Sequence, residues 1–262
     1  MCSVPSWRVH KVVLSQALQE VSGELGSLRR EFVEGLFRGV VEPDEVPDKA
    51  VRSRVRVARG GVRVHSYEGY AKHHTVDNAL VKYYYNLALY YARRENQFLS
   101  GVALGRAIHY AQDGSVKTRR LLVLDVHDRV EREVEEAVKS IGRDVRRLCR
   151  DVKLSKEAST QGLEVLCIAF RKTCELLKNF LTELAKPVDF KRLRKRVWAI
   201  RFAKAAIATA AILTALAIES ILALALAIII SIGIAYYRPK TYYEAMKAGL
   251  MILKPHSYKP AY

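Results

Sequence analysis

Residues 104–113, with the sequence LGRAIHYAQD, contain a histidine and a carboxylate four residues apart, His109 and Asp113. On an α-helix this spacing places both side chains on one face, one turn apart, where they can bind the same metal ion. Residues 127–131, HDRVE, repeat the pattern with His127 and Glu131. The sequence therefore predicts two helices that each present a pair of metal ligands.

The segments on either side of this stretch read mainly as helices. The apolar spacing predicts helices over residues 76–94, 97–112, 123–141 and 158–185, and one over residues 9–36 that is broken or bent near Gly23 and Gly26. Residues 39–49 hold two Pro-Asp steps, which predict a loop whose carboxylates are not helical. Residues 51–64 predict either a short hairpin turning at Gly60-Gly61 or an irregular loop. The expected fold class is all-α, a multi-helix bundle.

The charge and the cysteines of the chain indicate its class of partner and its compartment. The formal net charge is +17, which indicates an anionic partner such as nucleic acid, lipid headgroups or another phosphate ester. The N-terminal ten residues lack the apolar core of a secretory signal. The cysteines form no CxxC motif and predict neither a disulfide framework nor an oxidising compartment; they are Cys2, Cys149, Cys167 and Cys174.

A long apolar segment follows the soluble part of the chain. Residues 205–237 carry one charge, Glu219. A straight helix of that length is about 50 Å long, well beyond the roughly 30 Å hydrocarbon core of a bilayer. The segment therefore predicts either one tilted or protruding transmembrane helix or a hairpin of two short helices turning near Glu219-Ser220. Eight basic residues against Asp189 between positions 186 and 204 predict, by the positive-inside rule, that the preceding domain is cytoplasmic.

The candidate ligands lie in an order that resembles the zinc-dependent phospholipases C and the related single-strand-specific zinc nucleases. The matching pieces span roughly residues 7–140, and LGRAIHYAQD is the most specific of them. The others are Trp7 and His10, Asp48 in VPDK, His65 in VHSYEG, and HDRVE. The resemblance implies an all-helical domain over residues 1–140. Additional amphipathic helices and a basic juxtamembrane segment (141–196), the transmembrane segment or segments (197–238) and a basic tail (239–262) follow.

The same resemblance implies one to three bound zinc ions and marks Asp48 as the candidate catalytic residue. Imidazole nitrogen and carboxylate oxygen suit zinc, and water on zinc, with its pKa lowered to near 7, can attack phosphorus. Carried over by position, the first zinc takes Asp48, His65, His109 and Asp113, the second takes His127 and Glu131, and the third takes His10, Asp113 and the main chain of Trp7.

The function expected on these grounds is a membrane-anchored, zinc-dependent phosphoric ester hydrolase that acts on phospholipid headgroups at the cytoplasmic face. An alternative is a nuclease or nucleotide phosphodiesterase, whose polyanionic substrate the positive charge would attract. A second alternative is a catalytically degenerate, metal-binding membrane scaffold. Two departures from the family pattern support it. Arg119 stands where the family has a histidine ligand, and Trp7 follows six residues that do not form a signal.

Overall fold

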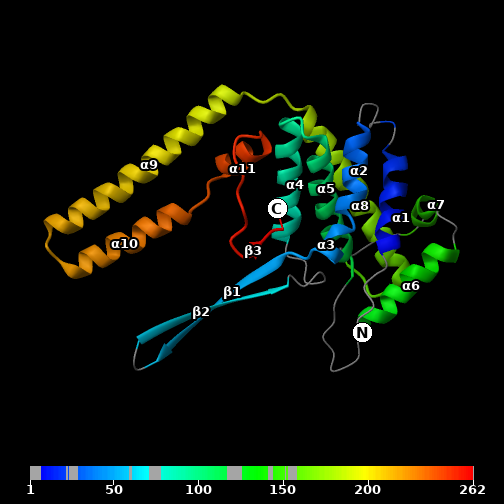
Figure 1. Ribbon diagram of the computed structural model, residues 1–262, viewed down its shortest axis with the longest axis horizontal. Helices are drawn as coiled ribbons and strands as arrows, with labels where there is room; N and C mark the ends of the chain where they lie inside the picture. Colours follow the sequence, from blue (N-terminus) through cyan, green and yellow to red (C-terminus); the bar gives the residue numbers. More distant parts are fainter. Residues whose placement is uncertain are drawn as a thin grey trace. The chain divides into compact units, whose positions relative to one another are not determined.

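The computed structural model is mainly helical and forms two compact units (Figure 1). It describes residues 7–21, 23, 29–58, 61–70, 78–116, 126–140, 144–150, 152 and 158–261, with only the backbone of residues 52–58, 61–67, 70, 126–131 and 140. The first unit comprises Met1–Lys186 and Lys254–Tyr262, and the second is Pro187–Leu253. The second unit is thus inserted between two parts of the first. This division differs from the predicted one, whose boundaries were at residues 140, 196 and 238.

The longer helices of the first unit pack as a bundle, and one of them is buried over most of its length. They are α1 (Trp7–Glu20), α2 (Arg30–Gly39), α4 (Asn78–Arg93), α5 (Gln97–Asp113), α6 (Val126–Ser140), α7 (Val145–Arg150) and α8 (Gly162–Ala185). Helix α5 begins where the Asn96 side chain accepts a hydrogen bond from the Leu99 N–H, and it is buried from Ser100 to Asp113. It contacts α2, α4 and α8. The predicted helix over residues 9–36 is broken into α1 and α2, as its glycines indicated.

Glycines allow α2 and α5 to approach each other closely. Gly35 and Gly39 of α2 lie four residues apart, as do Gly101 and Gly105 of α5. A Cβ atom added at Gly101 would lie 2.1 Å from the backbone oxygen of Phe32, so no side chain fits there. The close approach matters for the candidate site because the chain that leaves α2 lies directly against the C-terminal half of α5.

Replacing Gly101 with valine is expected to lower the free energy of unfolding by about 3 kcal/mol, the upper part of the usual range for overpacking. The obstacle is backbone, which cannot rotate away as a flexible side chain can. Gly23→Ala is the matched control, since a Cβ atom there meets nothing within 4 Å. Thermal or denaturant unfolding of the two variants measures the difference, and equal stability would show that α2 and α5 are not in close contact.

A small sheet departs from the all-α prediction. Strands β1 (Lys49–Ala58) and β2 (Gly61–Tyr70) form an antiparallel ribbon, and β3 (Tyr258–Lys259) pairs with the start of β1. Of the two alternatives predicted for residues 51–64, the hairpin is confirmed, but its strands are longer than predicted and Gly61, expected in the turn, pairs with Ala58. The predicted loop before it contains a one-turn helix, α3 (Glu42–Glu45), so three of its carboxylates are helical. Pro43 is compatible with this turn because the N–H that proline lacks is not needed in the first turn of a helix.

The absence of disulfides predicted from the sequence is wrong. Cys149 of α7 and Cys167 of α8 are joined by a disulfide, with their Cα atoms 5.2 Å apart. The two residues are 18 positions apart, and no short motif relates them. Both are buried, and the bond ties α7 to the helix that packs against α1 and α5.

Breaking this bond with Cys149→Ser is expected to lower the free energy of unfolding by about 3 kcal/mol, the value typical for a loop of this length. Denaturant unfolding of the variant measures the loss. Thiol counting under denaturing, non-reducing conditions is the direct check. Two reactive thiols per chain are expected from the intact protein, and four would show that the disulfide does not form.

The second unit is a helical hairpin followed by a short helix: α9 (Phe190–Ala217), α10 (Ile221–Tyr236) and α11 (Lys240–Lys247). Helices α9 and α10 pack against each other, and the chain turns at Glu219, whose φ is 54°, and Ser220, whose hydroxyl caps α10. The hairpin alternative is therefore the one observed. Two stretches, Phe190–Ala217 and Ile221–Lys247, are long and apolar enough to cross a membrane.

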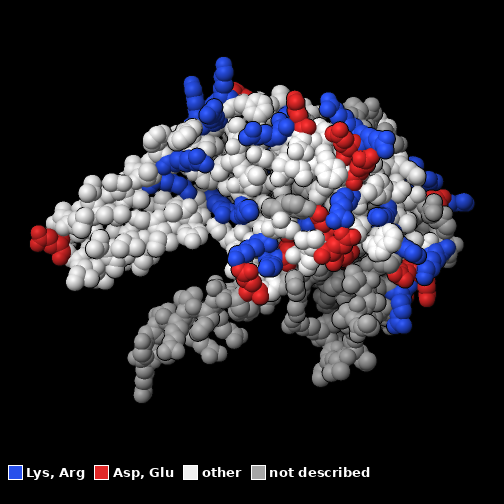
Figure 2. Space-filling model, in the orientation of Figure 1, with Lys and Arg blue, Asp and Glu red and all other residues white. Residues whose placement is uncertain are grey.

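The surface of this hairpin is apolar and exposed. Figure 2 shows almost no charged group along the visible face of the two helices between the basic end and the turn. Ile221 is 88% exposed, Leu222 72% and Ile229 63%. In the first half of α9 there is a small core, in which Val197 packs with Tyr242 and Ala245 of α11. An apolar surface of this extent is typical of a helix pair in contact with lipid.

Candidate metal centre

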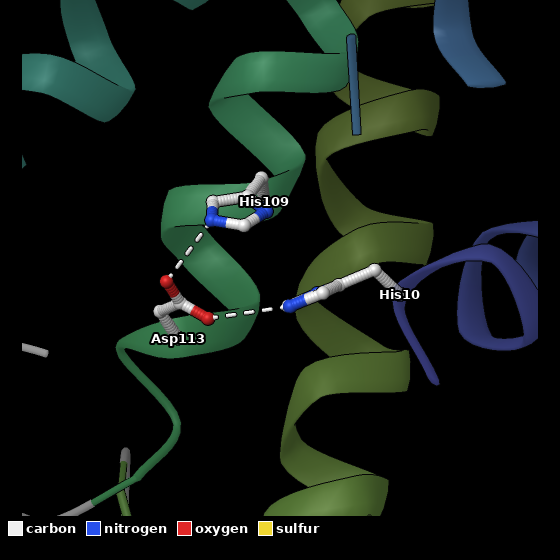
Figure 3. A group of neighbouring side chains, drawn as sticks. All are labelled: His10, His109 and Asp113. Atoms are coloured by element: carbon white, nitrogen blue, oxygen red, sulfur yellow. Dashed lines mark ion pairs between the residues drawn. The ribbon is translucent and has the colours of Figure 1, made fainter. Parts of the chain in front are cut away.

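Three buried side chains from two helices converge in the first unit (Figure 3). His10 comes from α1, and His109 and Asp113 come from α5. His109 Nε2 lies 3.1 Å from Asp113 Oδ2, and His10 Nε2 lies 3.6 Å from Asp113 Oδ1. Donor atoms around a tetrahedral zinc ion with bonds of 2.1 Å are about 3.4 Å apart. The three side chains could therefore hold a metal ion.

The positions of the three residues follow from helix geometry. His109 and Asp113 are one turn apart on α5, so they share a face, as their spacing predicts. His10 belongs to the buried face of α1, together with Val13, Leu14 and Ala17. That face packs against α8, and His10 reaches α5 from there, with its ring centroid 4.4 Å from that of His109.

The orientation of His109 is fixed by the main chain that follows α2. Its Nδ1 lies 2.9 Å from the carbonyl oxygen of Val40. A carbonyl only accepts hydrogen bonds, so His109 carries a hydrogen on Nδ1 and donates it. In the neutral ring Nε2 then holds the lone pair, and this is the nitrogen that faces Asp113.

The orientation of His10 is fixed in the same way by a chain of side chains. Its Nδ1 lies 2.6 Å from Oε1 of Gln112, whose amide nitrogen donates to Thr173 Oγ1 at 3.0 Å. The Thr173 hydroxyl in turn donates to the carbonyl of Ala169. Gln112 Oε1 is therefore an acceptor, His10 donates from Nδ1, and its neutral ring also presents the Nε2 lone pair to Asp113.

Two imidazole lone pairs aimed at one carboxylate repel it unless a positive charge lies between them. That charge is either a proton on the ring or a metal ion. Burial opposes protonation of His109, but the carboxylates of Asp113 and Asp44 and the Val40 carbonyl outweigh it and raise the pKa of the ring. Histidine ligands of metals commonly donate their other ring N–H to an acceptor, as both histidines do here.

Asp44 lies beside the cluster and was not predicted as a ligand. Its Oδ1 is 3.7 Å from His109 Nε2, and its side chain is partly buried. A buried arginine holds this part of the chain against α5. Arg106 donates to Glu42 Oε2 at 2.9 Å and to the carbonyl of Val46 at 3.0 Å, and it lies 3.1 Å from Asp48 Oδ1. Both ends of the segment that carries Asp44 are thus fixed.

The structure does not bring Asp48, the predicted ligand and catalytic residue, into the cluster. Tyr84 donates to its Oδ1 at 2.6 Å and Tyr110 to its Oδ2 at 2.5 Å, while the Ala261 N–H donates to Oδ1. Burial raises the pKa of both phenols, so they remain neutral donors. The Asp48 carboxylate therefore links α4, α5 and the C-terminal segment, and Asp44 lies where a carboxylate near His109 was expected.

For three of the remaining predicted ligands, the structure describes only the backbone. His65 lies in β2, paired with Arg54, and its side chain is outside the described residues. His127 and Glu131 lie in α6, as predicted, but their side chains are also outside the described residues, as is Arg119. Trp7 begins α1 and is 48% exposed. Their predicted contacts with zinc remain predictions.

The cluster borders a small cavity. It has a volume of about 40 Å³ and reaches His10 and Asp113 between α1, α6 and α8, with walls formed by Val9, Val13, Val134 and Leu166 among others. This is enough room for water beside the two side chains, since a water molecule needs about 10–15 Å³ by this measure. A larger cleft of about 350 Å³ lies between α4 and α8, but none of the three cluster residues lines it.

Zinc is expected to raise the unfolding midpoint more at about pH 8 than at about pH 6. The raised pKa of His109 means that zinc must displace a proton below that pKa, so zinc affinity falls as the pH is lowered. In the metal-free protein, the stability gained from that proton is present below pH 6.5 and lost as the pH rises through the raised pKa. Both effects make the zinc-induced shift of the unfolding midpoint larger at the higher pH. Thermal unfolding with and without zinc measures them, and equal zinc-induced shifts at the two pH values would contradict this expectation.

Comparison of the chain with protein-family models, with curated proteins and with solved structures found no match. What the cluster can bind thus follows from its own donor atoms and their spacing. The resemblance to the zinc phospholipases C remains a prediction.

Proposed function

We propose that this protein is a membrane-attached zinc protein that hydrolyses phosphate esters, with lipid headgroups as the substrate class. The observation that carries the proposal is the convergence of His10, His109 and Asp113, with both Nδ1 atoms held by acceptors. Two imidazole nitrogens and a carboxylate are a donor set that suits zinc and leaves a coordination position open for catalysis. A further carboxylate, Asp44, lies nearby, with its Oδ1 3.7 Å from His109 Nε2.

The placement of Asp113 between the two histidines supports its role as the carboxylate of the site. One of its oxygens faces His109 and the other faces His10 (Figure 3). When bound, zinc supplies Lewis acidity and an activated water near neutral pH. The protein orients the ligands through Val40 and Gln112 and limits solvent to the small cavity beside them.

Membrane attachment is proposed from the second unit. Its helices α9 and α10 expose apolar side chains along their length, and the chain enters and leaves the unit from the same compact body, at Lys186 and Lys254. Both ends of the hairpin therefore lie on one side of the bilayer. The basic residues just before α9 and in its first half favour the cytoplasm as that side, by the positive-inside rule.

A second candidate function is a scaffold that keeps zinc for stability. The burial of the cluster favours it, because His10 is 3% exposed, His109 0% and Asp113 4%, and the adjoining cavity is too small for a headgroup. In this case the metal fixes α1 to α5 and no substrate reaches it.

Metal analysis combined with turnover assays separates the two. The purified chain is assayed on a chromogenic phosphodiester, on phospholipid vesicles and on single-stranded nucleic acid, before and after chelation. Hydrolysis of phospholipid that chelation abolishes and zinc restores supports the hydrolase. Bound zinc without turnover leaves the scaffold, hydrolysis of nucleic acid alone replaces the lipid substrate, and the absence of bound metal overturns both candidates.

A further inference from the structure

The β1–β2 ribbon has two chemically different faces. Its register runs from the Lys49–Tyr70 pair to the Ala58–Gly61 pair, a length of about 33 Å at 3.3 Å per residue. Strand β3 pairs only with Lys49 and Ala50 at the base. In Figure 1 the ribbon extends away from the helices of its own unit.

The register assigns the residues of the ribbon to these faces. Successive residues of a strand alternate between faces, and directly paired residues share one. One face of the outer part carries Val55, Val57, Val62 and Val64, and the other carries Arg52, Arg54, Arg56, Arg63, His65 and Tyr67. The base differs, because Glu68 forms ion pairs with Lys49 and Lys259. The ribbon is thus amphipathic toward its tip and charge-balanced where it joins the sheet.

We propose that this ribbon lies on the surface of an anionic lipid bilayer, with the valine face toward the acyl chains and the arginine face toward the phosphates. A two-stranded ribbon is marginally stable in water by itself and gains from a surface that covers it. Arginine binds phosphate through charge-assisted, paired hydrogen bonds. A basic, amphipathic element is the pattern of interfacial membrane binding.

A lipid interface accounts for both faces at once. Nucleic acid would bind the arginine face and leave the four valines in water. A second copy of the chain would cover the valines but would bring together two molecules that each carry a net charge of +17. The inference goes beyond the proposed function, since it depends neither on zinc nor on hydrolysis.

Neighbouring residues on opposite faces provide a matched pair of probes. Val57→Cys and Arg56→Cys are made in the full chain with Cys2→Ser and Cys174→Ser, labelled with an environment-sensitive fluorophore, and placed in nanodiscs of phosphatidylcholine with or without phosphatidylglycerol. With phosphatidylglycerol, the label at 57 is expected to be quenched severalfold by acyl-chain nitroxide lipids, and the label at 56 to remain open to aqueous iodide. Replacing the four arginines of the arginine face with glutamine is expected to make the quenching of the label at 57 the same with and without phosphatidylglycerol.

Each alternative to a lipid interface would give a different result. Equal iodide quenching at both positions would overturn the proposal in favour of a solvated ribbon. Shielding that appears only when RNA is added would indicate nucleic acid, and shielding that rises with the number of chains per disc would indicate a second copy. Zinc content and hydrolysis measured on the same samples report on the proposed function independently.

Discussion

His109→Ala is expected to reduce zinc affinity by more than about 100-fold, because even the outer partners of a metal ligand are worth 10- to 100-fold. The variant removes the nitrogen that lies 3.1 Å from Asp113 and 3.7 Å from Asp44, and with it the contact that both carboxylates share. Competition with a chromogenic chelator gives the affinity, and metal analysis of the purified variant gives the stoichiometry. The stoichiometry is expected to fall by at least one ion per chain.

His256→Ala is the matched control, since it removes a histidine from the C-terminal segment rather than from the cluster. It is expected to keep the zinc content of the unchanged protein. His109→Ala also leaves a cavity in the core, so circular dichroism and the unfolding midpoint are recorded to show that the variant is folded. A folded His109→Ala protein with unchanged affinity would contradict the assignment of the metal centre.

The double substitution Leu213→Arg and Ile229→Arg is expected to release the chain from membranes. Each residue lies within the apolar part of its helix, and both side chains are more than half exposed. An arginine at the centre of a membrane helix costs about 2.5–3.5 kcal/mol on insertion scales. Two such costs shift the distribution between membrane and water by about three orders of magnitude or more.

Carbonate extraction of membranes measures this shift. The unchanged chain and the Leu213→Ile, Ile229→Leu control are expected to remain in the pellet, and the arginine variant to appear in the supernatant or as aggregate. Recovery of the unchanged chain in the supernatant would contradict membrane attachment by the hairpin.

The local part of the site could be predicted from the sequence. The spacing of His109 and Asp113 fixes their common face on α5 whatever the rest of the chain does. The apolar stretch whose one charged residue, Glu219, lies near its centre likewise predicted the hairpin as one of two alternatives. Each of these inferences depends only on neighbours along a single element.

The carboxylate near His109 could not be chosen from the sequence. Pro43-Asp44 and Pro47-Asp48 are the same dipeptide four residues apart, and neither has a local feature that excludes it. The choice is made by Arg106 of α5, which pairs with Asp48 and, through Glu42 and the Val46 carbonyl, fixes the turn that carries Asp44. Such a contact joins residues about 60 positions apart and leaves no local pattern.

Two further features were missed for different reasons. The disulfide between Cys149 and Cys167 depends on how α7 docks on α8, and cysteine spacing does not encode that docking. The close approach of α2 and α5 did have a pattern, namely glycines four residues apart in both helices. Spacing of that kind indicates close helix packing, and it could have paired the two helices before the structure was known.

X-ray absorption spectroscopy of the zinc-loaded protein tests the metal centre most directly. The structure predicts a coordination shell of nitrogen and oxygen at about 2.0–2.2 Å, with the multiple scattering of two imidazole rings and no sulfur. The His10→Ala variant is expected to lose the contribution of one ring. A shell with sulfur at about 2.3 Å, or one without imidazole, would show that zinc binds elsewhere and that His10, His109 and Asp113 do not form the site.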